Sequence, residues 1–395
     1  MVQESTNSLC SRTFLADLLR PAGGIGGLSR SMIATALFAI FVVANSACAA
    51  TLVVAQVGPM SGLHATQGSA YAAGMQLEFE RVNSSGGVNG HTITLVKRDD
   101  AGRPQDTVGL TKQALAENQP IALAGYFGSE NIRQLLASGL LDKWGIALVG
   151  YRGSELRSDS PNLFSVRAGL REELNKITEH LGMIGITRLG LLVEAGPEFD
   201  VVVSETDRAA KAAKLTVDVR ASYPAKTASV AEAVGAFLRR PPQAIIMVSS
   251  GAASAAFIEQ YRGVGGAAQL FAHSGADIEQ LSKRLAEEQM QGVAIAQVTP
   301  SPYKITTRLA KEFSNAVAKT KHLEVPVSFS MMEGFITARV ITESIRRQGP
   351  NPSRKGVLAA LQDMGDFDSG GYLVSYRPGQ QLGSRFVELS IVTAS

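Results

Sequence analysis

The stretch that decides the fold is VGPMSG, residues 57–62. It follows a strand-like run from Thr51 to Gln56 and precedes a long helical pattern that opens near Ala65. A strand that ends in a Gly/Pro/Ser turn and leads into a helix presents backbone N–H groups and a hydroxyl at the carboxyl edge of a sheet, where open α/β folds bind small ligands. The turn lacks the lysine of a phosphate-binding loop, and it reads GxxSG where a nucleophile elbow reads GxSxG. It therefore favours a binding turn over a catalytic one.

The N-terminal segment has the pattern of a secretory signal. The apolar run Ile33 to Val43 is too short to span a bilayer, which needs about 20 residues, and three arginines precede it. Ala47-Cys48-Ala49 follows, so we expect a signal peptide over residues 1–49, cleavage after Ala49 and export to the periplasm. Met1 and Met32 are both possible start residues. Lipidation of Cys48, which would anchor the protein, is the alternative to soluble export.

The length and charge of the chain narrow the function classes. Removing 49 of the 395 residues leaves 346, which corresponds to about two domains. The mature part holds 35 basic and 33 acidic residues, and both cysteines lie in the leader. This balance gives no electrostatic basis for binding nucleic acid or an anionic membrane, and the mature chain can form no disulfide.

Strand and helix patterns alternate along most of the chain. We expect strands at 51–57, 92–97, 121–126, 146–149, 188–193, 216–222, 244–248, 269–273 and 292–297. Amphipathic helical patterns lie between them at 65–83, 104–117, 172–182, 229–238, 252–262 and 277–287. Short apolar strands separated by helices predict α/β architecture, with parallel sheets covered on both faces.

The pattern changes after Tyr303. Two long helices, 306–321 and 328–348, follow one another without a strand between them, and a short helix is expected at 353–364. A final pair of strand patterns, 371–376 and 386–392, reads as a hairpin.

Several motifs together resemble one known family. GPMSG at 58–62, NSSGGVNG at 83–90 and the aspartates 99 and 100 follow one another in the order and spacing of the type I periplasmic binding proteins. GYFGS at 125–129, WGI at 144–146, EGF at 333–335 and GSRFV at 383–387 continue the resemblance over the mature chain. The most similar subgroup is the branched-chain amino-acid-binding components of ABC uptake transporters.

The resemblance implies a two-lobed architecture. Two Rossmann-like lobes would be joined by a three-segment hinge, with the ligand in the interlobe cleft and closure by hinge motion. Lobe 1 would comprise residues 51–166 and 300–365, and lobe 2 residues 167–299 and 366–395. A chain that returns to finish its first lobe explains why helices alone follow residue 303.

The resemblance also suggests ligand-binding residues in lobe 1. Ser129 matches the serine that meets the ligand carboxylate, although it could instead cap a helix, and Ser154 matches a second hydroxyl position. Arg152 matches a small residue whose backbone contacts the ligand, so its side chain could point into the cleft or into solvent. Gln67 stands where a tyrosine often covers the ligand, but a solvated helix face is the favoured interpretation of this glutamine. Ser61 adds the hydroxyl of the turn at 57–62.

Lobe 2 supplies three further candidates. Phe199 matches an aromatic ligand contact, with a core position as the alternative, and Ser250 replaces an aromatic wall residue. Ser274 falls where amino-acid-binding relatives carry a glutamate for the ligand ammonium. Asp277 is the nearest acid, and we expect it to cap the next helix. These departures predict a ligand with a carboxylate but no α-ammonium, in a roomier pocket than one for leucine.

Other polar signals favour structural roles. The five histidines are scattered without metal-ligand spacing, and Asp99 and Asp100 are expected to hydrogen-bond the adjacent turn. We expect no metal, no cofactor and no catalytic residue.

These observations lead to one functional hypothesis and two alternatives. The chain is predicted to be a monomeric periplasmic receptor that captures a small organic molecule, amino-acid-like or an aromatic or aliphatic acid, and delivers it to an inner-membrane ABC permease. A receptor of the same fold that serves a signalling protein is the first alternative. A secreted hydrolase that uses Ser61 or Ser129 is the second, but no His/Asp partner is evident nearby in the sequence.

Overall fold

The computed structural model describes residues 49–153, 160–380 and 382–393. The expected signal peptide with Cys48, and Ser154, therefore lie outside the described residues. Within the described ranges no helix combines the length and apolar character needed to cross a membrane.

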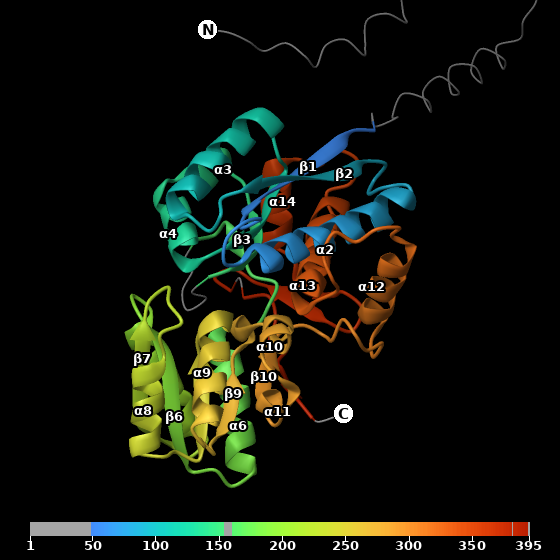
Figure 1. Cartoon of the computed structure of the whole chain (residues 1–395). Coiled ribbons are helices and arrows are strands. Elements are labelled where there is room, and N and C mark those ends of the chain that lie inside the picture. Colours follow the sequence, from blue (N-terminus) through green and yellow to red (C-terminus); the bar gives the residue numbers. More distant parts are fainter. Residues whose placement is uncertain (1–48, 154–159, 381, 394–395) are drawn as a thin grey trace, which may run out of the picture. The chain divides into compact units, whose positions relative to one another are not determined.

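The first lobe is built on a parallel sheet of strand order β2-β1-β3-β4-β5 (Figure 1). Its strands are β1 (Thr51–Gly58), β2 (Thr92–Asp99), β3 (Ala122–Phe127), β4 (Leu148–Arg152) and β5 (Leu163–Phe164). Successive residues of β3 are all buried, because alternate side chains point to opposite faces and helices cover both.

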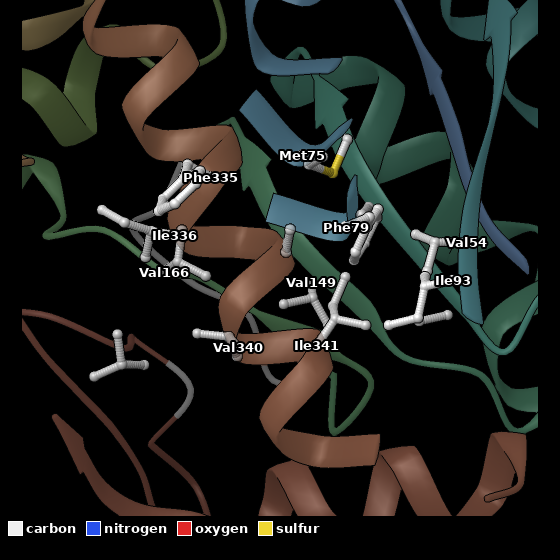
Figure 2. Close-up of a cluster of buried hydrophobic side chains, with 14 of the residues drawn as sticks. Val54, Met75, Phe79, Ile93, Val149, Val166, Phe335, Ile336, Val340 and Ile341 are labelled. Atoms are coloured by element: carbon white, nitrogen blue, oxygen red, sulfur yellow. The ribbon is translucent and has the colours of Figure 1, made fainter. Parts of the chain in front are cut away.

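Helices from both ends of the chain cover this sheet. Residues of α3 (Pro104–Asn118), α4 (Ser129–Ala137) and α5 (Leu140–Trp144) pack in the cluster on one face. The other face carries α2 (Ala65–Ser84), α12 (Arg308–Lys319), α13 (Phe329–Arg346) and α14 (Arg354–Gln362). Figure 2 shows side chains of α2, α13 and the strands meeting in this second cluster.

Two glycines allow α2 and α13 to touch backbone to backbone. A Cβ added at Gly74 would lie 1.8 Å from the carbonyl oxygen of Met331, and one added at Gly334 would lie 2.0 Å from that of Tyr71. Close helix approach of this kind needs residues without a side chain. The EGF motif at 333–335 therefore has a packing role in the first lobe.

The second lobe repeats the α/β pattern. Its sheet has the order β13-β10-β9-β8-β6-β7, and only β13 runs antiparallel. The strands are β6 (Arg188–Ala195), β7 (Thr216–Pro224), β8 (Ala244–Val248), β9 (Gln269–Ala272), β10 (Ala294–Gln297) and β13 (Glu388–Ile391). One face packs against α6 (Leu170–Met183) and α7 (Phe199–Ala212). The other packs against α8 (Ala231–Arg239), α9 (Gly251–Gly263), α10 (Ile278–Arg284) and α11 (Glu287–Met290).

Three chain crossings join the lobes, as expected from the resemblance. They follow β5, β10 and the hairpin strand β12 (Leu373–Tyr376). Tyr372 lies between the first two crossings, since its Oη is 2.8 Å from the carbonyl oxygen of Val166 and 2.9 Å from that of Val298. One phenol thus ties two hinge segments together.

The predicted C-terminal hairpin is wrong in its pairing. β12 pairs with β11 (Gly365–Asp368), and β13 instead joins the edge of the second sheet beside β10. The tight turn between β11 and β12 explains the difference. Asp368 accepts hydrogen bonds from the N–H groups of Gly370 and Gly371, which have φ angles of 110° and 91°. Only glycine adopts such angles readily. The chain therefore turns between β11 and β12, at the start of the expected strand 371–376, and this turn pairs β12 with β11.

The hairpin also bears on the lobe boundaries. Val374 and Tyr376 of β12 are buried in the cluster of the first sheet. We therefore propose that the third crossing lies between Tyr376 and Glu388, further along the chain than residue 365. The remaining expected boundaries, at about 166 and 300, stay proposals.

Candidate ligand-binding site

The candidate residues lie at the carboxyl ends of parallel strands. β1 has β2 on one side and β3 on the other, and β6 likewise lies between β7 and β8. Chain connections leave such a strand in opposite directions, and the loops at its carboxyl end separate to form a crevice. Ser129 and Arg152 follow β3 and end β4, while Ser250 and Ser274 follow β8 and β9.

A pocket lies where residues of both lobes and the hinge meet. Most of its lining is polar: Arg152, Arg167, Ser274, Asp277, Ile278, Glu279, Gln297, Val298, Thr299, Phe329, Ser330 and Glu333. Of the sequence-derived candidates, Arg152 and Ser274 line it directly, and Gln67 hydrogen-bonds two of its residues. A pocket lined in this way suits a polar ligand more than a purely apolar one.

The side chain of Arg152 turns inward to an acid that the sequence did not single out as a site residue. Its Nη2 and Nε atoms lie 2.6 and 3.1 Å from Oε2 of Glu333, a residue of α13 that is 1% exposed. The guanidinium carbon also lies 5.2 Å from the ring centre of Phe127 and 5.9 Å from that of Tyr71. Ion pairing and ring contact fix this guanidinium at the pocket wall.

Ser274 belongs to a buried network around the hinge arginine. Its backbone N–H and hydroxyl donate to Glu173 of α6, at 2.6 and 2.9 Å, and its hydroxyl accepts a hydrogen bond from Arg167. Nη1 of Arg167 lies 3.6 Å from Glu333. Ser274 thus stands where amino-acid-binding relatives carry a glutamate, and the carboxylate of Glu173 from α6 contacts it.

Gln67 is buried and linked to the second lobe. It is 7% exposed, so the interpretation as a solvated helix face is wrong. Its amide nitrogen donates to Oδ2 of Asp277 at 2.7 Å, and its amide oxygen lies 3.4 Å from Nη1 of Arg152. Asp277 also caps α10 by accepting from the N–H of Gln280, which confirms the expected capping role.

Glu279 is the most perturbed acid of the pocket. Burial and the neighbouring Asp277 raise its pKa to about 7. It accepts hydrogen bonds from the N–H of Phe329 at 2.8 Å and lies 2.8 Å from Oη of Tyr303. The pKa of His64, which lies near Asp277, is also shifted. Burial lowers it most and the charge of Arg152 lowers it further, so the imidazole of His64 is neutral at pH 7.

Ser129 and Ser61 occupy different environments. Ser129 is the first residue of α4, and Gly128 takes the N-cap position, so the capping alternative for Ser129 is wrong. Ser61 is exposed, and its N–H donates to Oδ1 of Asp99, as does that of Met60. Burial opposes ionisation of Asp99, yet the Ser61 hydroxyl and these N–H groups outweigh it and lower its pKa. The structural role expected for Asp99 is confirmed.

The other lobe 2 candidates have structural partners. Phe199 opens α7 and packs partly buried against the core of the second sheet. Ser250 caps α9 by accepting from the N–H of Ala253 at 3.3 Å. Their contact with a ligand stays a prediction.

The sequence alone missed most of the acidic lining. Glu333 was noted only within a motif, and Glu279 was not considered. The expectation that the pocket offers no acid to a ligand ammonium is therefore wrong, because Asp277, Glu279 and Glu333 all line it. The position of Glu279 in the first turn of the helix that Asp277 was expected to cap could have pointed to it. In the described ranges no group of three His, Cys, Asp or Glu side chains is placed to hold a metal.

Comparison with known proteins agrees with this architecture. A family model described as periplasmic binding protein matches residues 51–385. The chain belongs to this family. A substrate-binding periplasmic protein from Ralstonia solanacearum is similar to this periplasmic binding protein at 35% identity, over 87% of this chain and 98% of that one, with a TM-score of 0.80. The family fold is that of a solute-binding protein of type I, not of an enzyme, and it implies a periplasmic or other extracytoplasmic location.

Two further relatives extend the comparison. An amino acid binding protein from Pseudomonas aeruginosa is 34% identical over 100 residues, which are 25% of this chain and 26% of that protein. The match thus spans about a quarter of that relative's length. The branched-chain amino acid transporter substrate binding protein LivJ from Streptococcus pneumoniae, solved with isoleucine, shares 14% identity over 86% of this chain and 99% of that chain. Its TM-score of 0.69 shows a shared fold alone.

Proposed function

We propose that this periplasmic binding protein is the receptor component of an ABC-type uptake system and binds a small carboxylate-bearing molecule in the interlobe pocket. Binding uses hydrogen bonds and ion pairing, and no covalent bond is made or broken. The names of the relatives, an amino acid binding protein and a transporter substrate binding protein solved with isoleucine, support this class of ligand.

The observation that carries the proposal is the anchored guanidinium of Arg152. A guanidinium has five N–H donors, and Glu333 uses two of them on one edge. Among the described residues, only Gln67 contacts Nη1, at a long 3.4 Å. The N–H groups of that outer edge therefore suit the two oxygens of a carboxylate, which a guanidinium binds well in bidentate geometry.

Unsatisfied polar atoms add to the case for a polar ligand. The amide nitrogen of Gln297, the hydroxyl of Thr299 and Oε1 of Glu333 are buried, and none has a hydrogen-bond partner within the described structure. All three residues line the pocket. Buried polar groups are costly when unpaired, so a ligand that supplies partners gains binding free energy.

The acids in the pocket broaden the expected ligand class. Because Asp277 and Glu279 could receive an ammonium, the proposal covers amino acids as well as simple aromatic and aliphatic acids. Ser129 remains a proposed second contact for the ligand carboxylate, since it begins the nine-residue helix α4.

A thermal-shift panel tests the ligand class. Mature protein, residues 50–395, would be heated with leucine, isoleucine, valine, isovalerate and benzoate, and with the uncharged amides isovaleramide and benzamide. A ligand at a thousand times its Kd adds about 4 kcal/mol of stability, and each kcal/mol raises the Tm by roughly 2–4 °C for lobes of this size. We expect at least one acid to give such a rise. A Tm that responds to none of the acids and instead rises with uncharged compounds would contradict the proposal.

Export is tested by the N-terminus of the protein. If residues 1–49 form a cleaved signal, protein recovered from the periplasm should begin at or near Ala50, and N-terminal sequencing reads this directly. A lipidated N-terminus at Cys48 would support an anchored receptor. A cytoplasmic product that retains Met1 would contradict the proposed location.

A further inference from the structure

Two neighbouring acids of the second lobe meet neutral groups of the first. Asp277 accepts from the amide of Gln67 at 2.7 Å, and Glu279 accepts from the N–H of Phe329 at 2.8 Å. Both donors belong to helices that cover the first sheet, α2 and α13. Contact between the lobes thus partly buries both carboxylates, and the two first-lobe donors that contact them are uncharged.

Tyr303 and Phe329 both donate to Oε1 of Glu279. The Tyr303 hydroxyl and the backbone N–H of Phe329 each lie 2.8 Å from this oxygen. Both bonds favour the ionised carboxylate. Burial of Glu279 and the adjacent carboxyl of Asp277 outweigh them, so the pKa of Glu279 is raised.

Several charged or ionisable side chains surround Asp277 and Glu279. Arg152, Arg167 and Glu333 line the same pocket, and His64 faces Asp277. Arg152 and Arg167 are both engaged with Glu333, and His64 is held neutral by burial and by Arg152. Within the described ranges no Arg, Lys or His forms an ion pair with Asp277 or Glu279. Two adjacent carboxylates without such a partner repel each other unless they share a proton.

We propose that contact between the two lobes takes up a proton at the Glu279 carboxyl beside Asp277, which makes Glu279 a pH-sensitive latch of the receptor. This inference rests on the proposed receptor function and on hinge closure of the two lobes. Separated lobes would leave the Glu279 carboxyl hydrated and ionised at neutral pH.

The direction of the pH effect follows from the same groups. Burial and Asp277 raise the pKa of Glu279 from its ordinary value of 4.5 to about 7 in the contacting lobes. A raised carboxyl pKa means that the contact is favoured at low pH and loses stability as the pH rises through about 7. For one linked proton the equilibrium constant for lobe contact falls by at most about tenfold per pH unit between about 4.5 and 7, and it levels off above 7.

The chain is suited to a direct distance measurement. Both of its cysteines lie within residues 1–49, so the mature protein can carry nitroxide labels at introduced cysteines alone. Ser85→Cys, after α2 of the first lobe, and Lys211→Cys, in α7 of the second, are exposed positions. Double electron–electron resonance on the ligand-free labelled protein would then follow lobe contact between pH 6 and 8.5.

We expect the labelled protein to shift toward separated lobes as the pH rises from 6 to about 7, with little further change up to 8.5. Glu279→Gln keeps the size and hydrogen-bonding capacity of the side chain but cannot ionise, so its distances should not change with pH. Glu324→Gln, at an acid whose side chain is 77% exposed, should behave like the parent and serves as the control. Circular dichroism confirms that each variant is folded.

Two results would overturn the latch. One is a parent distance distribution that stays the same from pH 6 to 8.5, and the other is a Glu279→Gln variant that shifts as much as the parent. Because the measurement uses no ligand, it is independent of the thermal-shift panel. A failed panel would refute the proposed ligand class and leave this result standing.

Discussion

Replacing Arg152 with methionine is expected to weaken ligand binding by roughly thirtyfold to a thousandfold or more. Removing one partner of a buried, hydrogen-bonded charge pair costs about 2–5 kcal/mol of binding free energy. The variant loses the guanidinium edge that faces the pocket while retaining most of the apolar length of the side chain. Isothermal titration with the best acid from the thermal-shift panel measures the loss.

The same substitution also separates binding from folding. Glu333 is 1% exposed, and without Arg152 its nearest described cation is Arg167 at 3.6 Å. A buried charge left with a poor partner lowers the free energy of unfolding by about 2–3 kcal/mol, less than the full cost of breaking a buried pair. The double variant Arg152→Met/Glu333→Gln should recover that stability and still fail to bind.

A matched surface variant controls for the removal of an arginine. Arg346 forms an ion pair with Glu343 on the same helix, and its side chain is 54% exposed. Arg346→Met should change stability by less than about 1 kcal/mol and leave binding intact. If Arg152→Met bound the acid as tightly as Arg346→Met does, Arg152 would not be the carboxylate anchor.

Replacing Gly334 with alanine is expected to lower the free energy of unfolding by about 3 kcal/mol or more. The new Cβ would lie 2.0 Å from the carbonyl oxygen and 2.8 Å from the carbonyl carbon of Tyr71. Backbone atoms cannot rotate away as a side chain does, so α2 and α13 must separate and loosen the core that they share. Overpacking costs about 1–3 kcal/mol, and we expect at least the upper end of that range here.

A second helical glycine provides the control. Gly109 lies in α3, is exposed and has no atom within 4 Å of an added Cβ. Gly109→Ala should stabilise the protein by about 0.5–1 kcal/mol, because alanine favours a helix interior over glycine. Urea unfolding midpoints of the two variants give the comparison. Equal midpoints would show that the helix contact at Gly334 is not as close as described.

The fold could be predicted well from sequence because each of its main signals is local. The strand at 244–248 coincides with β8, and Pro104 opens α3 as its place in a first helical turn suggests. The C-terminal pairing failed because it depends on a non-local choice. The pattern at 386–392 is a strand in both interpretations, and only the sheet edge beside β10 decides its partner.

The site was predicted less completely, for physical reasons that differ between residues. Strand ends placed Arg152 and Ser274 correctly at the pocket, because loops after parallel strands converge. The inward turn of Arg152 depends on Glu333, which lies 181 residues further along the chain. The acids near Ser274 likewise come from a helix start and from α6. Such long-range charge pairing has no signature in a single sequence.

The central claim is that the pocket binds a carboxylate through the guanidinium of Arg152. The most direct test compares the best acid from the thermal-shift panel with its own primary amide, by isothermal titration to the mature protein. The two ligands have nearly the same shape and differ in charge. We predict that the amide binds at least about tenfold more weakly, because a charge-assisted hydrogen bond becomes a neutral one. An amide that binds as tightly as the acid would contradict the account.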